Sequence, residues 1–136
     1  MNKNTSESLV QSVIEWALDK KAGDVQVLDL RGVLDVTDFF VIAVGYSEVQ
    51  VQAISDGITD KSRETGLEFI NVEGREAGRW VLVDYVDVVV HVMLPEERDK
   101  YRLDRLWGDA GLTEYSEEGE ARVVREALSV GQGEET

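Results

Sequence analysis

Two aspartates and the chain's only histidine lie inside an otherwise apolar stretch, RWVLVDYVDVVVHVML, residues 79–94. Aspartate and histidine are residue types from which general-base and metal sites are built. The stretch divides into two strand-like segments, so Asp84 and Asp87 flank the turn between them and His91 lies within the second segment. Aspartates are common turn residues because their side chains accept local backbone hydrogen bonds. A lone histidine among valines is more often a packed cross-strand partner than a base. We therefore interpret the stretch as a β-hairpin, with strands over 79–83 and 88–93.

Three further segments predict strands beside this hairpin. Residues 24–30 alternate between apolar and polar side chains, as a strand with one covered face does. Residues 38–44, DFFVIAV, form an unbroken apolar run that is typical of a central strand covered on both faces. Residues 67–72 are interpreted as a third strand. Together with the hairpin, these segments predict a sheet of about five strands.

Three segments predict helices that flank this sheet. Apolar residues at helical spacing over 9–18 indicate the first helix. Ser47 opens a capping box and Gly66 suits a C-cap, which predicts a second helix between them. Pro95 suits the first position of a third helix that reaches about Trp107. The element order is then α-β-β-α-β-β-β-α, which places the chain in the α/β class with a mixed α+β sheet.

The composition changes near residue 110. Residues 111–136 carry seven glutamates against two arginines, which is typical of a weakly ordered segment. We expect one domain over 1–110 and an acidic C-terminal extension over 111–136. Within that extension we expect a short helix inside 117–130 and disorder in the last six residues, GQGEET.

The composition also limits the class of protein. A length of 136 residues suits a single domain, and no apolar run approaches the roughly 18 residues that span a bilayer. The N-terminal residues lack the apolar block of a signal peptide and the chain has no cysteine, so we expect a cytoplasmic protein without disulfides. The formal charge of −14 repels phosphate backbones, which predicts little direct nucleic-acid binding and favours basic partners.

One turn could hold a phosphate. Gly45, Tyr46 and Ser47 join a predicted buried strand to a predicted helix, as in nucleotidyltransferases, where a glycine-serine turn holds the triphosphate. That chemistry also needs two carboxylates on the following strand to bind metal ions, and residues 67–72 contain one acid only. No other phosphate-loop, dinucleotide or zinc motif is present. We therefore expect no enzyme activity, no cofactor and no metal.

The hairpin carries a tryptophan whose surroundings the pattern leaves open. Alternation places Trp80 and Leu82 on one face of the strand and Val81 and Val83 on the other. If no helix covers the face that contains Trp80, this ring near Tyr85 has the composition of a protein–protein hot spot. If a helix does cover it, Trp80 is a core residue.

The sequence resembles the ribosomal silencing factor family, also called the Iojap-like proteins. The resemblance covers about residues 24–110 and rests on a series of motifs, none of which is specific alone. They are LD-x-RG, TD-F-FVI, G-x-SE-x-QV-x-AI, VEG, RWVL-x-DY-x-D-VVVH and Y-x-LD-x-LWGDA. The resemblance implies a nucleotidyltransferase-like fold without transferase activity.

The resemblance also implies a function. Members of this family bind the large ribosomal subunit through its fourteenth ribosomal protein, on the face that meets the small subunit. They thereby block subunit joining and lower translation when nutrients are short. Members also self-associate, so we expect a homodimer at high protein concentration. The alternatives are a nucleotidyltransferase-like nucleotide-binding enzyme and an assembly factor of the large subunit.

The hairpin and the loop before it are the expected contact surface. The resemblance assigns contacts with the partner to the positions of Trp80 and Tyr85. We expect Asp84 and Asp87 to meet basic residues of the partner, and we add three neighbours of Trp80 to the surface, namely Glu73, Gly74 and Arg79.

One residue departs from the family pattern. The family usually has glycine in the hairpin turn, where this chain has Val86. Because a β-branched residue tolerates a positive φ poorly, we expect either another turn type or a strained turn.

Overall fold

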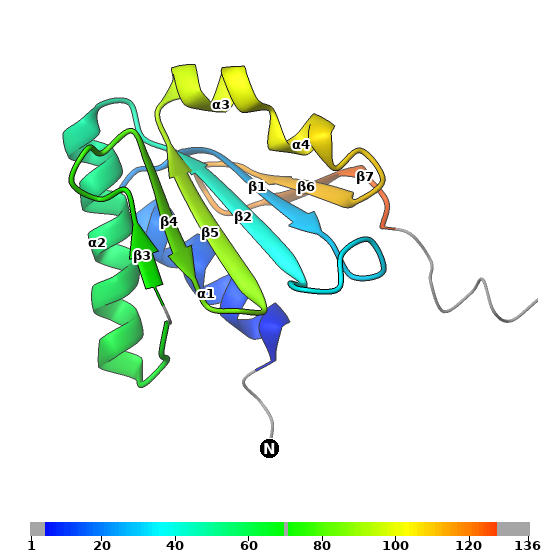
Figure 1. The fold of residues 1–136 in the computed structure, drawn as a ribbon, viewed down its shortest axis with the longest axis horizontal. Coiled ribbons are helices and arrows are strands. Elements are labelled where there is room, and N and C mark those ends of the chain that lie inside the picture. The colour runs from blue at the N-terminus through cyan, green and yellow to red at the C-terminus, as the bar shows by residue number, and fades with distance from the viewer. Residues whose placement is uncertain (1–4, 70, 128–136) are drawn as a thin grey trace, which may run out of the picture.

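The computed structural model describes residues 5–69 and 71–127, which form one sheet with helices on both of its faces (Figure 1). The helices within these residues are α1 (Ser6–Asp19), α2 (Glu48–Thr65), α3 (Pro95–Tyr101) and α4 (Leu103–Leu106). The strands are β1 (Gly23–Asp29), β2 (Phe39–Val44), β3 (Asn71–Glu73), β4 (Trp80–Asp84), β5 (Val88–Met93), β6 (Gly111–Tyr115) and β7 (Ala121–Arg125). No helix among them is both long and apolar enough to cross a membrane.

The seven described strands lie in the order β3-β4-β5-β2-β1-β6-β7. β2 and β5 pair in parallel at the centre of the sheet, with Phe39 opposite Val88 and Val44 opposite Met93. All other neighbours are antiparallel. A mixed sheet whose central strands are apolar on both faces fits the predicted α/β class, and the expected central position of residues 38–44 is confirmed.

α1 and α2 cover one face of the sheet. Their caps explain where they begin: the Thr5 hydroxyl accepts a hydrogen bond from the Ser8 amide at 3.1 Å, and the Ser47 hydroxyl accepts one from the Gln50 amide at 3.0 Å. α2 ends at Gly66, whose φ of 79° is the left-handed conformation that glycine adopts without strain. The core beneath these helices includes Val13, Ala17, Val51, Ile54, Ile58, Val81, Val83, Val90 and Val92, all 0% exposed.

The opposite face of the sheet, here called the second face, has a smaller core. Leu28, Leu30, Ile42, Met93, Ala110 and Leu112 are buried there, and Leu103 and Trp107 of the α4 region pack against them. α3 and α4 lie at the end of the sheet where β5 ends (Figure 1). The second face is therefore covered by helix at one end only.

The expected single helix from Pro95 to Trp107 is wrong, because the chain breaks at Arg102. This residue has a φ of 38°, and α3 and α4 lie on either side of it. Its guanidinium donates to both carboxylate oxygens of Asp104, at 3.1 and 2.8 Å, and this pairing lowers the pKa of Asp104. The break turns α4 toward the sheet, so Leu103 and Trp107 reach the second-face core.

The expected helix within 117–130 is also wrong over its described part, because residues 111–125 form the β6–β7 hairpin. β6 pairs with β1 from Val25–Tyr115 to Asp29–Gly111, which extends the sheet beyond residue 110. Gly119, at a φ of 88°, and the Ser116 hydroxyl, which accepts from the amides of Glu118 and Glu120, build the turn. The expected disorder of residues 131–136 lies outside the described residues.

The predicted third strand is shorter than expected. β3 contains only Asn71, Val72 and Glu73, which pair with Asp84, Val83 and Leu82 of β4. It is the edge strand on this side of the described sheet. The sheet therefore has two more strands than the predicted five, because β6 and β7 were not expected.

Candidate partner-binding surface

Trp80 lies on the second face, where neither α1 nor α2 covers it. Val81 and Val83, its neighbours on β4, are fully buried on the helix-covered face, and alternation places Trp80 and Leu82 on the other. The Trp80 indole Nε1–H donates to His91 Nδ1 at 3.1 Å, and its ring lies 4.9 Å from the Tyr101 ring of α3. Trp80 is thus fixed on two sides while part of its surface remains exposed.

Three other apolar side chains on the second face are partly exposed. Leu82 lies opposite His91 across β4 and β5, and Val89 lies opposite Phe40 across β5 and β2. We call Trp80, Leu82, Val89 and Phe40 the second-face patch. Partly exposed apolar side chains that are contiguous on a sheet face are typical of a protein–protein contact.

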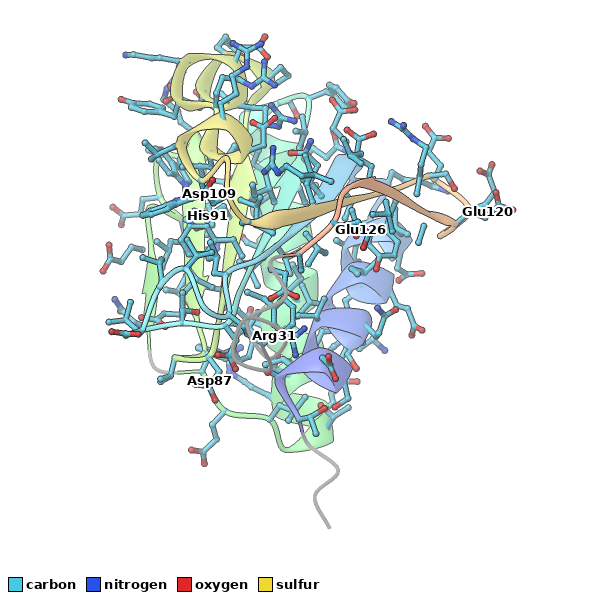
Figure 2. The ribbon with its side chains drawn as sticks, turned by 90° about the vertical axis from the view of Figure 1, so that its right-hand side faces the viewer. Arg31, Asp87, His91, Asp109, Glu120 and Glu126 are labelled. Atoms are coloured by element: carbon cyan, nitrogen blue, oxygen red, sulfur yellow. The ribbon has the colours of Figure 1, made fainter. Side chains whose placement is uncertain are left out.

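His91 is buried below this patch, on the side of the sheet away from α1 (Figure 2). It is 5% exposed, and burial lowers its pKa from 6.5 to about 4, so it is neutral at physiological pH. Its Nδ1 accepts the Trp80 hydrogen bond, which places the proton on Nε2. Within residues 5–69 and 71–127 no three His, Cys, Asp or Glu side chains come together to hold a metal ion.

The expectation that Tyr85 shares a surface with Trp80 is wrong. Tyr85 is 8% exposed and belongs to the core under α2, where its hydroxyl hydrogen-bonds to the Ser62 hydroxyl. Its ring meets Phe69 edge-on at 6.1 Å, and burial raises its pKa. Tyr85 follows Trp80 by five residues, and side chains separated by an odd number of residues in an extended chain point to opposite faces of the sheet. The sequence already contained this signal.

The Asp84 side chain supports the hairpin turn, as the sequence predicts, whereas Asp87 takes part through its backbone amide, which donates to the Tyr85 carbonyl at 3.0 Å. The Asp84 carboxylate accepts a hydrogen bond from the Val86 amide at 2.8 Å, and the Asp87 carbonyl accepts from the amides of Asp38 and Phe39. Val86 has a φ of 77°. The turn is therefore strained, as one of the two alternatives for this residue predicted, and does not avoid the positive φ by adopting another turn type. Asp84 lies beside the second-face patch, while Asp87 is exposed at the end of the sheet far from α3 (Figure 2).

The remaining expected residues support or flank Trp80. Glu73 on β3 lies opposite Leu82, so its carboxylate borders the second-face patch. Gly74 has a φ of 84°, and a Cβ there would lie 2.2 Å from the Trp80 carbonyl oxygen, so only glycine allows this approach. Arg79 is paired with Glu97 of α3 at 2.7 Å. The structure thus places Gly74 and Arg79 beside Trp80 and Glu73 opposite Leu82, whereas Asp84 lies at the other end of β4.

The sequence did not indicate Tyr101 or Phe40 as neighbours of this surface. Tyr101 is 45% exposed and lies against the Trp80 ring because Arg102 ends α3 at that point. Phe40 meets His91 edge-on at 4.5 Å between ring centroids. No motif indicates either contact, because each depends on how separate elements pack.

The first two backbone amides of the glycine-serine turn are already hydrogen-bonded within the protein. The Gln50 side-chain oxygen accepts a hydrogen bond from the Tyr46 amide at 2.7 Å, and its nitrogen donates to the Lys21 carbonyl at 3.0 Å. The Gly45 amide donates to the Met93 carbonyl at 3.0 Å. Gln50 therefore ties this turn to the end of α1, and these two amides are not available to a phosphate.

Comparison with known proteins gives consistent matches. Residues 3–134 match the family model described as "Ribosomal silencing factor during starvation". The chain is 44% identical to the ribosomal silencing factor RsfS of Halalkalibacterium halodurans, over 81% of this chain and 94% of that protein. It is 48% identical to RsfS of Bacillus subtilis, over 71% of this chain and 81% of that protein. A crystal structure of a protein from Chromobacterium violaceum has a TM-score of 0.73 at 39% identity and covers 75% of this chain and 85% of the other.

Proposed function

Because the chain belongs to the ribosomal silencing factor family, we propose that it binds the large ribosomal subunit and keeps it from joining the small subunit. The match over residues 3–134 is the observation that carries this proposal. The related proteins are named as silencing factors, which are regulators, and the chain is not an enzyme. Its place of action is then the cytoplasm, where the ribosomal subunits join.

We propose the second-face patch as the contact surface, with the fourteenth protein of the large subunit as its partner. The patch has an apolar centre, and Glu73 and Asp84 place carboxylates on the same face beside Leu82. Together with the formal charge of −14, this arrangement favours a basic protein surface and disfavours direct contact with RNA phosphates. All four patch residues precede residue 110, whereas the sheet that carries them continues through β6 and β7.

The test is substitution of Trp80 by alanine. A tryptophan ring that is fixed in place and partly exposed has the properties of a binding hot spot, so Trp80→Ala weakens binding to purified large subunits by about 30-fold, or roughly 2 kcal/mol. Binding is measured by co-sedimentation, and subunit joining by sucrose-gradient profiles of mixed large and small subunits. Circular dichroism confirms that the variant is folded at the temperature of the assay.

The matched control is Trp16→Ala. Trp16 is a partly buried tryptophan of α1 on the helix-covered face, so its removal costs stability but leaves the patch intact. We expect it to bind large subunits like the wild type. A folded Trp80→Ala protein that still prevents subunit joining at wild-type concentrations would show that this surface is the wrong one.

Two outcomes would favour other functions. An assembly factor would bind immature large subunits without blocking the joining of mature ones. A nucleotide-binding enzyme would bind nucleotide together with a divalent metal, and a Ser47→Ala substitution would abolish that binding. The expected homodimer stays a prediction, and if it uses the second-face patch, dimer formation and subunit binding compete.

A further inference from the structure

His91 uses only one of its two ring nitrogens within the described protein. Nδ1 accepts the Trp80 indole hydrogen bond, whereas Nε2 is buried and has no hydrogen-bond partner among residues 5–69 and 71–127. A buried donor without a partner lowers stability, because it has lost its hydrogen bond to water. An apolar residue of similar size would avoid that penalty. The contact with Trp80 is therefore the one hydrogen bond that the imidazole of this histidine makes in the described structure.

The surroundings of His91 hold its ring in one orientation. Phe40 meets it edge-on at 4.5 Å from β2, and the ring is 5% exposed. Its Nδ1 is thus a fixed acceptor beneath Trp80, on the strand next to it. A fixed acceptor restricts the rotamers available to the indole, whose other neighbour, Tyr101, is itself 45% exposed.

The hydrogen bond also decides which part of Trp80 a partner meets. Since the indole N–H already donates to His91, the partner does not receive this hydrogen bond and contacts the ring carbons instead. The ring face of tryptophan attracts apolar groups and the cationic side chains of lysine and arginine. The carboxylates of Glu73 and Asp84 on the same face favour the same cationic groups.

We propose that His91 is a positioning residue: it fixes the Trp80 indole so that the second-face patch presents the ring, and not its N–H, to a lysine- or arginine-bearing partner surface. This inference rests on the proposed function, since it concerns the same surface. His91 acts through Trp80 and does not itself touch the partner. Fixing the ring in advance reduces the rotamer freedom that binding would otherwise remove.

Three substitutions test this proposal. His91→Leu removes the acceptor but keeps an apolar side chain of similar size, and we expect binding to large subunits to weaken by about fivefold to tenfold. Its melting temperature should be equal to or above that of the wild type, because the unpartnered Nε2–H is gone. His91→Asn keeps an acceptor near the position of Nδ1, and we expect its affinity within about twofold of the wild type. Trp80→Phe keeps an aromatic ring without the N–H, and it should bind better than Trp80→Ala.

A second readout does not depend on the ribosome. The indole N–H signal of Trp80 in nitrogen-15 NMR spectra should shift in His91→Leu and remain close to the wild-type position in His91→Asn. If wild-type protein fails to bind large subunits but these shifts occur, the proposed function is wrong and the His91–Trp80 contact stands. If the wild type binds and His91→Leu binds equally well, the positioning role is wrong. Equal losses of affinity in His91→Leu and His91→Asn would also contradict it.

Discussion

His91 is a base that its surroundings keep neutral. Burial lowers its pKa from 6.5 to about 4, and no carboxylate hydrogen-bonds to it within the described residues to offset that effect. The combination of two aspartates and a histidine within residues 79–94 resembles an active site because these residue types act as general acids and bases. In the structure the Asp84 carboxylate supports the turn, Asp87 bonds through its backbone, and the histidine side chain accepts one hydrogen bond, so the three residues do not form one site.

This low pKa predicts how stability depends on pH. Between pH 6.5 and about 4 the unfolded chain protonates His91 while the folded chain does not, so protons favour unfolding as the pH falls. The free energy of unfolding should therefore decrease by up to about 3 kcal/mol across this window because of His91. Urea unfolding of the wild type and of His91→Asn at several pH values isolates this contribution as a difference between the two proteins.

The same comparison removes the effects of the acidic groups. Asp29, Asp56 and Asp104 have pKa values below 3.8, so their ion pairs are lost mainly at lower pH, and both proteins share them. A parallel dependence in both proteins between pH 4 and 6.5 would show that His91 is not the responsible group.

At the scale of the element, the β4–β5 hairpin separates its two aromatic residues. Trp80 lies on the second face and Tyr85 lies in the core under α2, so one strand serves both a surface and the interior. The turn that ends β4 is strained at Val86, where the Asp84 carboxylate holds the backbone in the left-handed region. The same aspartate therefore stabilises the turn and borders the second-face patch.

This strain predicts a stabilising substitution. Val86 has a φ of 77° and is 47% exposed, so glycine would relieve the steric cost of the β-branched side chain without leaving a cavity. We expect Val86→Gly to raise the free energy of unfolding by roughly 0.5–1 kcal/mol, the steric gain less the entropy that glycine loses on folding. Val86→Ala, which keeps a Cβ, should gain less in the same urea titration. A less stable Val86→Gly protein would mean that the turn is not strained.

At the scale of the whole molecule, residues beyond 110 belong to the sheet. β6 covers the edge of β1, and Leu112 is 4% exposed in the second-face core. Arg125 of β7 donates to the carbonyls of Ala110, Asp104 and Trp107, at 2.6, 3.1 and 3.2 Å. Its guanidinium thus joins the last described strand to the end of α4, a region that packs against the second-face core.

Two truncations therefore have different consequences. Removal of residues 128–136 leaves every described element intact, and we expect normal melting and normal binding to large subunits. Removal of residues 111–136 deletes β6 and β7, and the loss of buried Leu112 alone costs about 2–3 kcal/mol. We expect this shorter protein to lose its cooperative melting transition. If it melts and binds like the full chain, β6 and β7 are dispensable.

The sequence alone determined most of the elements and the family. Helical spacing, Ser47 and Gly66 as caps, and the apolar run over 38–44 locate α1, α2 and the centre of the sheet, because these signals are local. The motifs over residues 24–110 identify the ribosomal silencing factor family. Alternation in β4 showed that Trp80 and Val81 face opposite ways, but it did not show which face the helices cover.

Tertiary structure decided the features that depend on packing between distant segments. The break at Arg102 brings Leu103 and Trp107 onto the sheet, and no local signal outweighs the helical pattern there. Four of the five residues of β7 are exposed, so its sequence resembles that of a solvated segment. Only its pairing with β6 in the structure identifies it as a strand. The hydrogen bond between Trp80 and His91 joins residues on two strands, and only the register of β4 against β5 brings them together. A sequence pattern fixes periodicity within an element, whereas burial and contact depend on which elements meet.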